Sequence, residues 1–199
     1  MSVRFVDEID GGFGWIEDTQ IRRAAHALAV DGRVWIIDPF DAEGVDARVR
    51  ALGEPAAVLQ LLDRHERDAA AFAARYEVPH LVVPDSVPET PFELRPIARS
   101  RWWREVALWW PERRALVCAD ALGTAPYFRA GGEPIGVHPF LRLRPPRALV
   151  GLAPEHVLVG HGEGVHGSDV AAAVDDALRN ARRRLPRWFA QLPRLLRNG

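Results

Sequence analysis

Short apolar runs of strand length, each ending at turn or charged residues, recur along the chain. Two such runs, at 24–30 and 33–39, flank Asp31-Gly32, a dipeptide typical of tight β-hairpins. A second pair of runs is joined by Pro111-Glu112-Arg113, which predicts another hairpin over 105–119. The same pattern predicts shorter strands at 13–17, 57–62, 78–84 and 157–159.

Helical spacing of apolar residues appears between these strands. Val45, Val49 and Leu52 share one helical face, and Gly53 follows as a C-cap. An Ala-rich segment predicts a second helix over 68–76, and Ser168-Asp169 precedes a third that runs to about residue 184. The proline-rich residues 85–96 are expected to form a surface connection.

This order of elements predicts one α/β sandwich, with two sheets packed together and helices outside them. We assign residues 1–185 to this single domain and residues 186–199 to a basic amphipathic tail. The tail could lie on an anionic membrane surface, pack on a partner, or dock on its own domain. Its two prolines, Pro186 and Pro193, favour docking, and we expect no stable membrane anchoring.

Composition narrows the class of protein. Apolar residues make up 48% and charged residues 27% of the 199, as in globular proteins. The net charge of -1 argues against a nucleic-acid partner, and the single Cys118 excludes a disulfide framework or a cysteine-rich zinc site. No signal-peptide pattern or membrane-length apolar run occurs, so we expect a cytoplasmic protein that acts on a small molecule. A homodimer is compatible with these features.

Polar residues with metal-binding chemistry follow three of the predicted strands. The apolar run 58–62 ends at D-R-H-E-R-D, which contains Asp63, His65 and Asp68. Asp120 follows the second hairpin, and His161 follows the last strand. Carboxylates and imidazoles that converge from separate strands are what a zinc or iron site requires.

These segments, in this order, resemble the metallo-β-lactamase fold superfamily. The resemblance rests on the hairpin ending I-I-D-P, the strand followed by D-R-H-E-R-D in place of H-x-H-x-D-H, the hairpin ending C-A-D, and V-L-V-G-H-G. It covers roughly residues 13–185 and implies an αββα sandwich of two mixed sheets flanked by helices. It also implies a metal-dependent hydrolase.

The resembled metal site is only partly kept. His65, Asp120 and His161 match the superfamily's ligands, whereas Asp63 and Asp68 stand where it has histidines. Arg67 replaces the aspartate that binds a second metal and orients the attacking water. The mid-chain histidine falls near Ser100 or Arg101.

Two functions follow from this pattern. In the first, one divalent metal (zinc, iron or manganese) is held by His65, Asp120, His161 and Asp63 or Asp68, and the protein hydrolyses an ester, thioester or phosphoester. In the second, no metal binds. Arginine cannot ligate a metal and stays charged, so Arg67 and Arg101 would fill the site with salt bridges. Such a non-catalytic protein would bind a small ligand or a partner.

Further residues are expected around the site. The resemblance implies that Asp38 supports a metal ligand, and Trp102 and Trp103 are candidates to line a substrate pocket. His166 is expected at the surface or behind the ligands. The remaining histidines carry no motif and are interpreted as structural: His26, His80, His138 and His156.

Overall fold

The computed structural model describes residues 3–197 and consists of two mixed β-sheets packed face to face. The first sheet has the order β1-β2-β3-β4-β5-β6. Its strands are β1 (Val3–Ile9), β2 (Gly12–Glu17), β3 (Ala24–Val30), β4 (Arg33–Ile37), β5 (Glu54–Gln60) and β6 (His80–Val82). The pairs from β1 to β4 are antiparallel, and β4, β5 and β6 are parallel.

The second sheet has the order β13-β12-β9-β8-β7. Its strands are β7 (Glu93–Ser100), β8 (Trp103–Trp110), β9 (Ala115–Cys118), β12 (His156–Val159) and β13 (Val165–His166). Strands β9 and β12 are parallel, so both carboxyl ends reach the same edge of the sheet. A separate two-stranded ribbon joins β10 (Leu122–Gly123) to β11 (Gly136–Val137).

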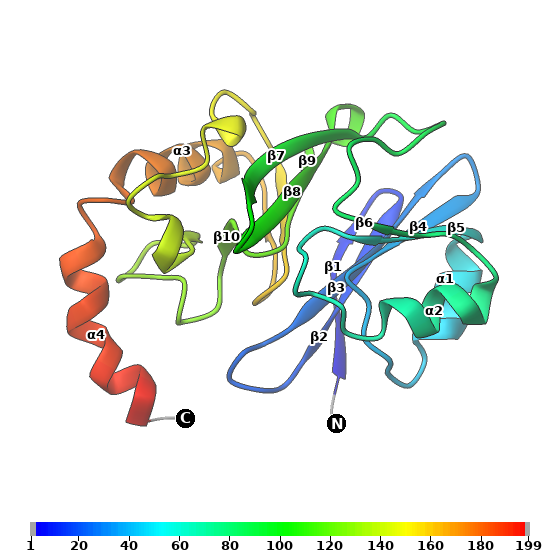
Figure 1. Ribbon diagram of the computed structural model, residues 1–199, viewed down its shortest axis with the longest axis horizontal. Helices are drawn as coiled ribbons and strands as arrows, with labels where there is room; N and C mark the ends of the chain where they lie inside the picture. The colour runs from blue at the N-terminus through cyan, green and yellow to red at the C-terminus, as the bar shows by residue number, and fades with distance from the viewer. Residues whose placement is uncertain (1–2, 198–199) are drawn as a thin grey trace.

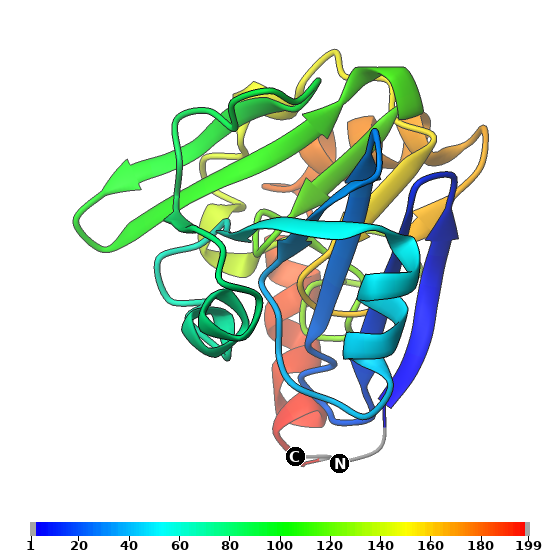
Figure 2. The same cartoon turned by 90° about the vertical axis from the view of Figure 1, so that its right-hand side faces the viewer.

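Helices cover the outer faces of both sheets (Figure 1). The first sheet carries α1 (Val45–Leu52) and α2 (Ala69–Tyr76); in the turned view of Figure 2, α1 lies in front of the strands and α2 lies to their left. The second sheet carries α3 (Val170–Asn180), whose Val174 and Leu178 pack against it. Three short 3-10 helices occur in the described part of the chain. The first, η1 (Pro111–Arg113), follows β8, while η2 (Pro139–Leu141) and η3 (Arg147–Leu149) lie between β11 and β12.

The core lies between the two sheets and includes Leu28, Leu59, Leu108 and Leu158. This arrangement confirms the predicted αββα sandwich. The predicted hairpin at Asp31-Gly32 is present, with positive φ angles of 49° and 76° at the two turn residues.

The sequence patterns missed β1, β7 and the two-residue strands β10, β11 and β13. The segment predicted as a surface connection contains the start of β7, an edge strand. Its register shifts between Pro96 and Ala98. Proline is tolerated there because an edge strand or a bulge leaves its missing N–H without a required partner.

The region predicted as an amphipathic tail forms α4 (Leu185–Arg197), while residues 198–199 lie outside the described range. Trp188 on this helix is buried, and its indole Nε1 donates to the carbonyl of Tyr127 at 2.7 Å. This contact fixes the helix on its own domain. Within residues 3–197, no helix is long and apolar enough to cross a membrane.

Candidate metal centre

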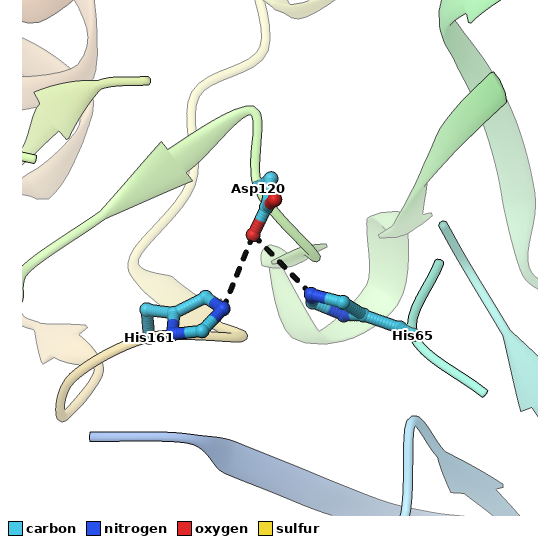
Figure 3. Close-up of side chains that lie close together, drawn as sticks. All are labelled: His65, Asp120 and His161. Carbon is cyan, nitrogen blue, oxygen red and sulfur yellow. Dashed lines mark ion pairs between the residues drawn. The ribbon is translucent and has the colours of Figure 1, made fainter. Parts of the chain in front are cut away.

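Three side chains from three strand ends meet at the edge between the sheets (Figure 3). His65 lies in the connection from β5 to α2, Asp120 follows β9, and His161 follows β12. Gly160 permits this close approach, because a Cβ there would lie 2.5 Å from the carbonyl oxygen of Ala119 and 3.0 Å from Cε1 of His65. The strand ends thus place two imidazoles around one carboxylate.

The three candidate ligand atoms all lie within 4.8 Å of one another. Nε2 of His65 and Nε2 of His161 are each 3.3 Å from Oδ1 of Asp120. That oxygen is fully buried and accepts no hydrogen bond of normal geometry among the described residues. A buried, unpaired carboxylate oxygen is costly unless a cation neutralises it.

Hydrogen bonds behind the two rings determine which nitrogen carries a proton. Nδ1 of His65 lies 3.0 Å from Oδ2 of Asp38, and Nδ1 of His161 lies 2.9 Å from the carbonyl oxygen of Ile21. Because both partners accept, each Nδ1 donates, and in a neutral ring Nε2 then carries a lone pair. Two such nitrogens and a carboxylate oxygen repel one another unless a metal ion or added protons lie between them.

Two nitrogens and one oxygen form a donor set that suits a divalent metal such as zinc. Catalytic zinc sites have three protein ligands of this kind and leave a further position open. Histidine ligands in such sites usually donate their other ring N–H to a carboxylate or a carbonyl, as His65 and His161 do here. The residues present therefore fit one metal ion.

When no metal is bound, protonation of a histidine could balance the charge of Asp120. Burial and Arg67 act to lower the pKa of His65, but Asp38 and Asp120 outweigh them, so its pKa is raised. Burial would raise the pKa of Asp120, but the neighbouring imidazoles hold it well below its usual range. Without metal, these charges thus favour a protonated His65 beside an ionised Asp120.

A second buried carboxylate, Glu105 on β8, supports Asp120 from behind. Its side chain accepts hydrogen bonds from the backbone N–H of Asp120 at 2.8 Å, from that of Ala121 at 2.7 Å, and from the indole of Trp103 at 2.7 Å. Burial, together with the charge of Asp120, raises the pKa of Glu105 to about 7. This residue was not predicted from the sequence. Its signal was the strand alternation, which puts it on the same buried face as Ala107 and Trp109.

Among the residues that the structure describes, Arg67 forms none of the predicted salt bridges with carboxylates. Its Nη1 donates to the carbonyl oxygens of Ala24 at 2.6 Å and Asp38 at 2.8 Å, and its Nη2 donates to that of Gly160 at 3.1 Å. The guanidinium therefore joins the ends of β3, β4 and β12. Burial lowers the pKa of Arg67, and Asp38 and Asp120 oppose that effect.

The other two acidic residues of D-R-H-E-R-D lie outside the metal-binding group. Asp63 Oδ2 accepts from the backbone N–H of Arg104 at 3.1 Å, and Asp68 Oδ2 accepts from that of Asp41 at 2.7 Å. Both carboxylates therefore bind backbone N–H groups of segments remote in sequence, which corrects the expectation that one of them is a ligand.

The predicted contribution of the 101–103 segment is also corrected. Arg101 is exposed and stacks on the ring of Trp102 at 4.2 Å, and Trp102 itself is 72% exposed. Trp103, the first residue of β8, is buried and packs on His138 with 4.8 Å between ring centroids. Neither tryptophan lines the cavity at the metal-binding group.

His166 belongs to a different cluster. Its Nε2 lies 3.2 Å from Oδ1 of Asp7, whose Oδ2 lies 3.3 Å from Nε2 of His26. Nδ1 of His166 lies 3.0 Å from Nδ1 of His156 across the β12–β13 pair. This cluster links β1 and β3 of the first sheet to β12 and β13 of the second.

A cavity of about 850 Å³ opens beside Asp120 and His161. It is lined by residues 18–22 and 125–128, by His138, and by Leu192 and Leu195 of α4. His138, interpreted from the sequence as structural, is buried there. Its Nδ1 accepts from the backbone N–H of Phe140 at 3.3 Å, and burial lowers its pKa to about 4. No sequence motif marked it, because its neighbours come from distant segments.

No protein-family model matches the chain, and no curated protein matches it significantly in sequence. Its structure is similar to the DIM-1 metallo-β-lactamase, with a TM-score of 0.60 and 11% identity over 91% of this chain and 98% of that one. For a metallo-β-lactamase from Hirschia baltica the TM-score is 0.60 and the identity 8%, over 93% of this chain and 98% of that one. For one from Pontibacter korlensis the TM-score is 0.55 and the identity 10%, over 90% of this chain and all of that one. The chain therefore has the metallo-β-lactamase fold.

Proposed function

We propose that this protein is a hydrolase of the metallo-β-lactamase fold that uses one divalent metal ion, zinc, iron or manganese, to cleave an ester, thioester or phosphoester. His65, Asp120 and His161 hold the ion. The observation that carries the proposal is the meeting of three lone-pair atoms within 4.8 Å, one of them a buried oxygen without a hydrogen bond. A bound divalent ion would supply a Lewis acid and a water acidic enough to lose a proton near neutral pH.

The surrounding residues keep the group ready for this task. Asp38 and the carbonyl of Ile21 fix the tautomers of the two histidines and the direction of their Nε2 atoms. Glu105 holds the backbone at Asp120, which limits the movement of its carboxylate. The cavity admits a substrate at the side of Asp120 and His161.

We further propose that the site holds one metal and not two. Arg67 stands at the position of the superfamily's second-metal aspartate, and its positive charge is anchored by the carbonyls of Ala24, Asp38 and Gly160. A fixed guanidinium repels a second divalent ion and cannot ligate it. In this sense the usual two-metal motif is degraded.

The test is hydrolysis by protein loaded with zinc, iron(II) or manganese(II). Chromogenic carboxylic esters, a thioester and a phosphodiester are compared with and without chelator. We expect hydrolysis of at least one class that the chelator abolishes, and a fall on the order of 100-fold or more in Asp120→Asn, since loss of even a supporting residue costs about 10–100-fold.

Asp41→Asn is the matched control, because Asp41 is an exposed aspartate paired with Arg75. Its rate should equal that of the unmodified chain. Hydrolysis that survives both the chelator and Asp120→Asn would refute the proposed metal site.

The alternative is a non-catalytic protein whose former metal site is neutralised internally. The raised pKa of His65, which reflects Asp38 and Asp120 against the opposing effects of burial and Arg67, favours a protonated ring. With Arg67 nearby, that charge would balance Asp120 without a metal. Failure to bind any of the three metals would favour this alternative, in which the cavity binds a small ligand.

A further inference from the structure

The walls of the cavity beside the metal-binding group are largely apolar. Phe128 stacks on the ring of His161, with centroids 5.6 Å apart and planes 23° from parallel. Ile21, Pro126, Leu192 and Leu195 extend the apolar lining away from the strand ends. An apolar surface therefore begins at a candidate metal ligand and continues outward, where a substrate group next to the scissile bond would lie.

Helix α4 supplies one of these walls. It turns away from α3 and runs beside the loops that follow β10 (Figure 1). Trp188 anchors it through the hydrogen bond to Tyr127 and an edge-to-face contact with the Tyr127 ring at 5.5 Å. Positions 188, 192 and 195 share one helical face, so anchoring Trp188 directs Leu192 and Leu195 to the cavity.

The charges of the lining distinguish between substrate classes. Among the described residues that line the cavity, Arg22 is the one lysine or arginine, and Asp18 and Asp120 oppose it. Phosphoryl groups are usually recognised by clusters of arginine or lysine or by helix N-termini. The described lining residues form no such cluster, whereas the apolar walls suit an uncharged chain.

We propose that α4 selects the substrate, and that the substrate is a carboxylic ester or thioester whose apolar acyl chain lies between α4 and Phe128. This inference rests on the proposed hydrolase function and narrows it, because it excludes phosphoesters. Burial of each methylene is worth about 0.8 kcal/mol, which corresponds to about fourfold in kcat/KM per added methylene until the cavity is full.

The direct test is binding of carboxylates, which needs no catalysis. Octanoate, acetate and inorganic phosphate are titrated calorimetrically into the full chain, with and without zinc. We expect octanoate to bind at least about tenfold tighter than acetate, with a negative heat-capacity change that marks apolar burial, and phosphate to bind more weakly than octanoate. Equal binding of octanoate and acetate, or tighter binding of phosphate, would overturn the proposal.

Substitutions on α4 locate the preference. Leu192→Asp and, independently, Leu195→Asp should remove the preference for octanoate, and Phe189→Asp should keep it. Phe189 is the matched control because it lies on the same helix but is 58% exposed and does not line the cavity. Two leucine variants are used so that the test can still be read if one of them misfolds. Near-ultraviolet circular dichroism of the tryptophans shows whether each variant is folded. A preference that survives in both folded variants excludes α4 as the selecting wall.

The two proposals can fail separately. Octanoate preference that depends on Leu192, without any hydrolysis, supports the apolar wall and refutes the hydrolase. Metal-dependent hydrolysis that is indifferent to chain length from acetyl to octanoyl esters supports the hydrolase and refutes selection by α4.

Discussion

Replacement of Glu105 by glutamine tests the buried polar network behind the candidate metal centre. The side chain is fully buried, and it accepts three hydrogen bonds while its pKa is raised to about 7 from the usual 4.5 by burial and by the charge of Asp120. A carboxyl group whose pKa is higher in the folded state stabilises the fold most at low pH. That contribution is lost as the pH rises from the unfolded pKa through the folded one.

The size of the effect follows from the two pKa values. Between about pH 5 and about pH 8, the contribution of Glu105 to the free energy of unfolding should fall by about 2–3 kcal/mol. Glutamine is neutral at both pH values and has nearly the same shape. The stability of Glu105→Gln relative to the unmodified chain should therefore improve by this amount across the range.

The assay is urea denaturation of both proteins at the two pH values in the presence of chelator, because a cation beside Asp120 would change the pKa of Glu105. Glu112→Gln is the matched control. Glu112 also accepts an indole N–H, from Trp110 at 3.3 Å, but it is exposed. A relative stability of Glu105→Gln that is the same at both pH values would refute the reasoning.

Three further substitutions test neighbouring contacts. Arg67→Ala removes three hydrogen bonds that join strand ends and should lower the free energy of unfolding by about 2–5 kcal/mol; a change under about 0.5 kcal/mol in urea denaturation would contradict this. Asp38→Asn keeps an oxygen for the backbone N–H of Leu61 but disturbs the tautomer of His65, so zinc affinity, measured against a chelating indicator, should fall about 10–100-fold. Unchanged affinity would show that Asp38 does not orient the ligand. Trp188→Ala removes the anchor of α4, so trypsin should cleave the arginine run 182–184 faster while the rest of the domain resists; an unchanged rate would show that another contact holds the helix.

Much of the fold could be predicted because its signals are local. Asp31-Gly32 marks a hairpin through the backbone angles that those two residues accept, and the apolar runs mark the strands on either side. The order of these elements then leaves few arrangements of the sheets. Strand β7 escaped prediction because Pro96 is compatible with a strand only at an edge or bulge, which is a property of the assembled sheet.

The site could be predicted only in part, for a related physical reason. His65, Asp120 and His161 follow strand ends that a mixed sandwich brings to one edge, so their meeting could be anticipated from order alone. Asp63, two residues before His65, instead accepts from the backbone N–H of Arg104, a partner remote in sequence that no local pattern marks. Glu105 acquires its place through packing partners remote in sequence.

The metal content of the protein tests the central claim most directly. Untagged chain is loaded with zinc, freed of excess by gel filtration, and measured by elemental analysis beside His161→Ala and a control, His80→Ala. His80 lies on β6, 3.1 Å from Oε1 of Gln60 and outside the metal-binding group. We predict about one zinc per chain in the unmodified protein and the control, and almost none in His161→Ala. No zinc in the unmodified chain, two per chain, or an undiminished content in His161→Ala would contradict a single metal held by His65, Asp120 and His161.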